Sequence, residues 1–136
     1  MNKLVSPHSW NLNVGIFLIR IFIGFFLIIH GKEVFDAVKM QEYVKWDTFK
    51  TSSLLPYLGK GAEFVAGVLI LLGLFTRVAA VITIGTFLYI TFMVGKGQFW
   101  MDDQHPFMFV LFGLLFLFTG PGAFSMDKWI YRKTKK

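Results

Sequence analysis

Charged residues interrupt two stretches that are otherwise apolar enough to lie in a membrane. Arg20 lies in the middle of residues 14–30 (VGIFLIRIFIGFFLIIH), and Glu63 lies within residues 57–75 (YLGKGAEFVAGVLILLGLF). An arginine at the centre of a spanning helix costs about 2.5–3.5 kcal/mol to insert, so it usually faces other helices and has a partner. The depths of the two residues differ by about one helical turn, ~5 Å. We therefore predict an Arg20–Glu63 contact; the alternative is that Arg20 extends to the nearby head groups.

Histidines and aspartates mark one end of the expected helices. His30 closes the first apolar stretch and His105 opens the last one, with Asp102 and Asp103 beside it. Such side chains could bind a divalent metal or relay protons. Their spacing matches no known ligand pattern, so we predict no metal site and favour a solvated rim. Asp102, Asp103 and His105 remain candidates for ligand contact at the outer face.

The rest of the chain offers no evident catalytic group. It has no cysteine, which excludes disulfides, thiolate zinc sites and iron–sulfur clusters. No nucleophile stands with a base in a pattern that indicates hydrolysis. We therefore expect no catalytic residue and no enzymatic activity of the chain's own.

The elements that must position these residues are apolar helices. Of the 136 residues, 55% are hydrophobic and 16% charged, and the mean hydropathy is +0.60. A soluble domain of this size exposes much of its surface to water, whereas lipid accepts such a composition. We predict one domain over residues 1–136, an all-α membrane protein built as an up-down bundle of four transmembrane helices at about 14–30, 57–75, 78–94 and 103–119.

The predicted connections differ in kind. Thr76-Arg77 is read as a tight turn between two antiparallel helices, and Gly120-Pro121-Gly122 ends the last helix. The long connection of residues 31–56 holds either a short amphipathic helix on the membrane surface or an ordinary loop anchored by aromatic residues. Residues 123–136 are predicted to be a basic tail. Small residues on the second helix favour close helix packing; they are Gly61, Ala62, Ala66, Gly67 and Gly73.

Charge sets the expected orientation. With four spans, both termini and the middle turn share one side, and that side carries the basic excess of Lys3, Arg77, Lys128, Arg132, Lys133, Lys135 and Lys136 against Asp127. The other side is nearly balanced. The positive-inside rule then places both termini in the cytoplasm, as a multi-pass protein of the cell (inner) membrane. The net charge of +6 reflects this topology, so we expect the lipid bilayer, and no nucleic acid, as partner.

Several short motifs follow one another along the chain. Arg20 and Gly24 stand with His30-Gly31-Lys32, and Glu63 and Gly67 stand with the run LGLFTR of residues 72–77. Gly120-Pro121-Gly122 with Ser125 and Asp127 closes the series. In this order they resemble the first-helix, second and closing motifs of the DoxX family of membrane proteins. The resemblance implies a small bundle of four helices associated with membrane oxidoreductases that feed the quinone pool. It also implies that Arg20, His30, Glu63 and Arg77 are family motif residues here.

Three functional hypotheses follow. The first is a non-catalytic subunit or partner of a quinone-linked system, which binds quinone or lipid near the Arg20–Glu63 pair; quinone is the one cofactor considered. The second is a structural or assembly protein of a larger membrane complex, in which the charges only fix helix packing. The third is a transporter of a small solute or protons, which would require a homo-oligomer because one chain of four helices is small for that task.

Overall fold

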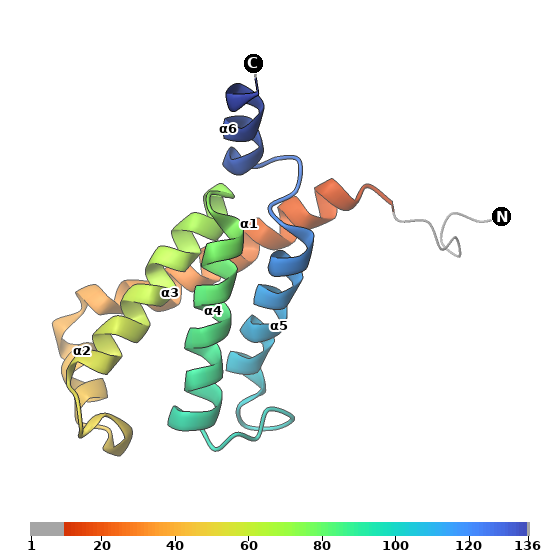
Figure 1. Cartoon of the computed structure of the whole chain (residues 1–136). Coiled ribbons are helices and arrows are strands. Elements are labelled where there is room, and N and C mark those ends of the chain that lie inside the picture. The colour runs from red at the N-terminus through yellow and green to blue at the C-terminus, as the bar shows by residue number, and fades with distance from the viewer. Residues whose placement is uncertain (1–9, 136) are drawn as a thin grey trace.

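The computed structural model of the chain describes residues 10–135, and in that range it consists of helices joined by turns and loops, without a strand (Figure 1). The predicted N-terminal cytoplasmic segment falls largely outside it. The helices are α1 (Leu12–Gly31), α2 (Ala37–Val44), α3 (Leu54–Leu72), α4 (Thr76–Tyr89), α5 (Gln104–Thr119) and α6 (Met126–Thr134), with 3₁₀ turns at Lys32–Phe35 and Asp47–Phe49 and a π-helical turn at Ile90–Val94. The all-α prediction is confirmed.

The main contacts between the apolar helices follow the order α1, α3, α4, α5, here called the row, and successive members run in opposite directions (Figure 1). α1 and α5, the first and last members, also meet at His30 and His105. The most extensive contact is between α1 and α3, where glycines face the backbone of the partner helix. A Cβ atom at Gly24 would lie 2.7 Å from the amide nitrogen of Leu71, and one at Gly67 would lie 2.8 Å from that of Ile28. The predicted close packing of the second helix is therefore present at Gly67, because only hydrogen fits there.

The helices of the row contact one another mainly through apolar side chains, and their outer faces are apolar too. The fully buried residues of the central hydrophobic cluster come from α1, α3, α4 and α5; they are Leu27, Ala66, Ile70, Ala79, Ala80 and Phe116. Large side chains also point outward, among them Phe22, Leu111 and Phe118, the last 79% exposed. A surface of this kind is stable against lipid and is rare on a protein surrounded by water.

Three helical segments are long and apolar enough to cross a membrane: Leu12–Phe35, Leu54–Leu72 and Thr76–Val94. They correspond to the first three predicted helices. α5 is also apolar but has only 16 residues, which extend about 24 Å at 1.5 Å per residue. A fourth span and the orientation of the termini therefore stay predictions.

The turn between α3 and α4 lies a few residues earlier than predicted. α3 ends at Leu72 because Gly73 adopts a left-handed conformation with φ +66°, and Phe75 follows with φ +47°. Thr76 and Arg77 already belong to the first turn of α4. Glycine accepts a left-handed conformation without steric cost, so the helix ends at the glycine and not at the polar residues.

Two short helices lie at opposite ends of the long helices: α2 near the start of α3, and α6 near the turn between α3 and α4 (Figure 1). α2 occupies part of the long connection and begins at Asp36, whose carboxylate accepts hydrogen bonds from the amides of Val38 and Lys39. The long connection therefore contains a helix, as the first alternative predicted, and the place of this helix on the membrane surface stays a prediction. α6 begins at Ser125, whose hydroxyl accepts from the amide of Lys128. Much of the predicted basic tail is therefore helical, because an N-cap serine starts a helix here.

Candidate functional site

Arg20 is buried, with 2% of its surface exposed, but it does not contact Glu63. Its guanidinium donates one hydrogen bond from Nη1 to the carbonyl oxygen of Pro121 at 2.9 Å and another from Nη2 to that of Phe124. The predicted Arg20–Glu63 pair was wrong, and the reason is the register of the antiparallel helices. Arg20 lies beside Gly73, and Glu63 is ten residues earlier on α3, about 15 Å along the helix.

The end of the row that holds Arg20 is closed by the chain segment after α5. The Asp127 carboxylate accepts hydrogen bonds from the amides of Phe75 at 2.7 Å and Thr76 at 3.0 Å. The Asp127 amide donates back to the carbonyl of Gly73 at 2.9 Å. Arg77 is exposed beside this contact, next to Gly120. This end is a structural junction of α1, α3, α4 and α6.

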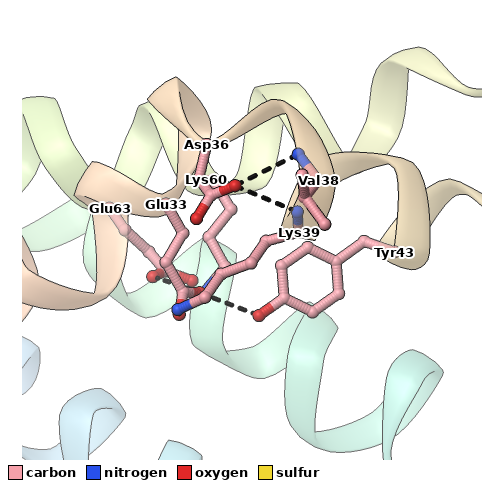
Figure 2. A network of polar contacts seen from close by, with 7 residues as sticks. All are labelled: Glu33, Asp36, Val38, Lys39, Tyr43, Lys60 and Glu63. Atoms are coloured by element: carbon pink, nitrogen blue, oxygen red, sulfur yellow. Dashed lines mark hydrogen bonds and ion pairs between the residues drawn. The ribbon is translucent and has the colours of Figure 1, made fainter.

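Glu63 instead belongs to a network of polar side chains under α2 (Figure 2). Lys60 Nζ lies 3.3 Å from Glu63 Oε2 and 3.1 Å from Glu33 Oε2. Glu33 also accepts from the Tyr43 hydroxyl at 2.8 Å and forms an ion pair with Lys39 at 2.9 Å. Lys60 therefore lies between two carboxylates, and only Glu63 of this network was predicted as a site residue.

The sequence did contain a signal for this network. Lys60 and Glu63 are three residues apart, which places them on the same face of a helix. Glu33 follows directly on His30-Gly31-Lys32. The end of the first span therefore places Glu33 at the same end of the helices as Lys60. Tyr43 could not be assigned, because its approach to Glu33 depends on how α2 folds back.

A pocket of about 200 Å³ lies beside the network, between the α2 region, α3 and the end of α4. It is mainly apolar, with Lys60 and Glu63 at its wall. Part of that wall is the π-helical turn at Ile90–Val94, an irregularity found frequently at functional sites. The lining residues are Tyr43, Trp46, Phe49, Leu55, Pro56, Gly59, Lys60, Glu63, Tyr89, Ile90 and Val94.

The network changes the pKa of Tyr43, a residue that lies outside the candidate spans. Burial of the phenol, together with its hydrogen bond to Glu33, raises the pKa of Tyr43 to about 12. Both effects disfavour the phenolate, because a charged ring would lose water and face a carboxylate. The tyrosine therefore stays a hydrogen-bond donor.

His30 and His105 meet at the end of the helices that also holds Glu33. Their ring centroids lie 5.6 Å apart with the planes at 62°, and both rings pack edge-on against Phe109. From this contact an apolar groove of about 420 Å³ runs between α1 and α5. Its lining residues are Leu18, Ile19, Phe22, Ile23, Phe26, His105, Met108, Phe109 and Phe112.

The two aspartates near His105 have different surroundings. Asp103 accepts hydrogen bonds from the amides of Lys96 and Gln98, both at 2.9 Å, and so fixes the loop before α5. Asp102 is exposed. Over residues 10–135, no three histidine, aspartate or glutamate side chains come together in a way that could hold a metal ion. Of the outer-face candidates, the structure brings together His30 and His105.

The apolar helices, their exposed phenylalanines and the buried charges define an integral membrane protein with several candidate spans. The family model for DoxX matches residues 15–96, and the chain belongs to the DoxX family. The match runs from α1 to the loop after the π-helical turn, so it includes Arg20, His30, Glu63 and Arg77. No curated protein and no solved structure matches the chain.

Proposed function

We propose that the chain is a non-catalytic membrane subunit or partner of a quinone-linked oxidoreductase system and that it binds quinone or lipid between α1 and α5. The observation that carries the proposal is the apolar groove whose lining includes His105, which is itself in ring contact with His30. A groove lined by apolar side chains suits a hydrocarbon tail, and the imidazole N–H of His105 could donate to a quinone carbonyl. The association of DoxX-like proteins with the quinone pool supports this choice of ligand.

In this proposal α5 is a fourth span, and both termini face the cytoplasm across the inner membrane. The hydrocarbon layer is about 30 Å thick, and a helix of about 24 Å is accommodated when the bilayer thins locally or flanking residues extend to the interface. The basic residues of α6 support the orientation, since they lie at the same end as Arg77; they are Lys128, Arg132 and Lys133. Cytoplasmic segments are enriched in such residues.

The test is quinone retention by the whole protein. The protein is extracted gently from its own membrane, its mass is measured under native conditions, and the bound lipids and quinones are identified. We expect a quinone in the wild type, and less of it in His105→Ala and in Met108→Trp, which fills the groove. Asp102→Ala is the matched control, because Asp102 is exposed outside the groove. Protein that carries no quinone and does not bind one in titration would refute the proposal.

A structural or assembly role is the second candidate, and the contacts of Arg20 favour it. Both hydrogen bonds of its guanidinium go to backbone carbonyls of the segment after α5. Arg20 thereby acts as a packing residue. If the chain has this role, groove variants keep the partner complex intact, whereas Arg20→Ala lowers its amount in the membrane.

A further inference from the structure

The pocket under α2 has charged side chains in its wall, Lys60 and Glu63, which the groove between α1 and α5 lacks. Four aromatic side chains also line it: Tyr43, Trp46, Phe49 and Tyr89. The rings of Tyr43 and Trp46 meet edge-on with centroids 4.9 Å apart, and Trp46 stacks on Phe49 at 6.4 Å. The pocket therefore combines flat apolar walls with the charged residues of the network.

Glu63 has hydrogen-bonding capacity left over at this pocket. It is 3% exposed, and among the described residues it accepts one hydrogen bond, from Lys60 to Oε2. A carboxylate can accept about four. Glu33, by contrast, is engaged at both oxygens by Lys39, Tyr43 and Lys60. A buried carboxylate with one long hydrogen bond favours a further donor.

Among the mostly buried charged groups at the pocket, the balance of charge is negative. Glu33 and Glu63 are compensated by one mostly buried ammonium group, that of Lys60, whose side chain is 18% exposed. Lys39 also pairs with Glu33 but is half exposed, so water and salt screen its contribution. A buried charge without full compensation is costly, and a bound cation would reduce that cost.

We propose that this pocket binds a small organic ammonium ion, whose N–H groups donate to Glu63 while its apolar part lies against the aromatic rings. Aromatic faces attract ammonium groups, and the attraction grows when water is excluded. A volume of about 200 Å³ is below the range of about 300–1,000 Å³ for drug-sized ligands, so the ligand is small. The aromatic walls exclude a bare metal ion, which requires several oxygen or nitrogen ligands. An anion in this pocket would face the Glu63 carboxylate and be repelled by it.

Benzylammonium is the probe, and benzyl alcohol is its neutral counterpart of the same shape. The whole protein is prepared with Trp46 as the one tryptophan, through Trp10→Phe, Trp100→Phe and Trp129→Phe. Its fluorescence is followed during titration at neutral pH. We expect saturable quenching by benzylammonium, with a Kd at least about tenfold lower than that for benzyl alcohol.

Two pairs of variants separate the site from effects on folding. Glu63→Gln should weaken binding of benzylammonium at least about tenfold, whereas Glu42→Gln, an exposed acid on α2, should not. Gly59→Leu fills the pocket from open space beside α3 and should abolish quenching, whereas Gly61→Leu, also in open space but outside the pocket, should not. Equal binding of the alcohol, or unchanged binding in both Glu63→Gln and Gly59→Leu, would overturn the proposal.

Discussion

The Nη1 atom of Arg20 lies 2.9 Å from the carbonyl oxygen of Pro121, a residue 101 positions further along the chain. The other terminal nitrogen reaches the carbonyl of Phe124, so the guanidinium joins α1 to the segment between α5 and α6. Two carbonyl groups with no helix to satisfy them thereby receive donors. A planar guanidinium suits this task because its N–H groups point in fixed directions.

Replacement of Arg20 should therefore destabilise the protein. Arg20→Met keeps much of the volume but leaves the carbonyls of Pro121 and Phe124 without donors, at a cost of about 1–3 kcal/mol. We expect a lower thermal midpoint in detergent, and only partial recovery in Arg20→Lys, since one ammonium group cannot reproduce the planar fork. Arg132→Met on exposed α6 is the control. An unchanged midpoint in Arg20→Met would contradict this role.

Asp127 should hold α6 against the turn between α3 and α4. Asp127→Ala removes the acceptor of two amides at the start of α4, Phe75 and Thr76, and loss of such a cap costs about 0.5–2 kcal/mol. Hydrogen exchange measured by mass spectrometry should become faster in residues 73–77 and in α6. Asp102→Ala, which changes an exposed aspartate elsewhere, should leave these segments as they are; the same exchange in both variants would exclude the capping role.

The contact between α1 and α3 predicts a contrast between two glycines. A Cβ atom at Gly31 would overlap the backbone of Phe64, whereas one at Gly85 would enter open space. Gly31→Ala should lower stability by about 1–3 kcal/mol, as overpacking does. Gly85→Ala should be neutral or raise stability by up to about 1 kcal/mol, because alanine favours the helix. Thermal midpoints of both variants in one detergent would test the contrast, and equal midpoints would contradict it.

The same contact shows how far the sequence could predict the site. Apolar length and charge were enough to place three candidate spans and to mark Arg20 and Glu63 as buried. Their partners depend on the register of α1 against α3, which is set by steric fit at Gly24 and Gly67. No periodicity reports such a fit. The contact between Lys60 and Glu63 could be predicted more easily, because it is local. Pro121 reaches Arg20, and Tyr43 reaches Glu33, only through tertiary folding.

The ionisation of Tyr43 offers a test of the network in Figure 2. A free tyrosine has a pKa of about 10, and burial and the acceptor Glu33 raise that of Tyr43 to about 12. Because the folded value is higher, the contribution of Tyr43 to stability is fully present below about pH 10 and is lost as the pH rises through about 12. Tyrosinate absorbance should therefore show a late step that disappears in Tyr43→Phe. Tyr131→Phe on exposed α6 is the control. If the late step persists in Tyr43→Phe, the phenol is not held by Glu33 as the geometry of the network requires.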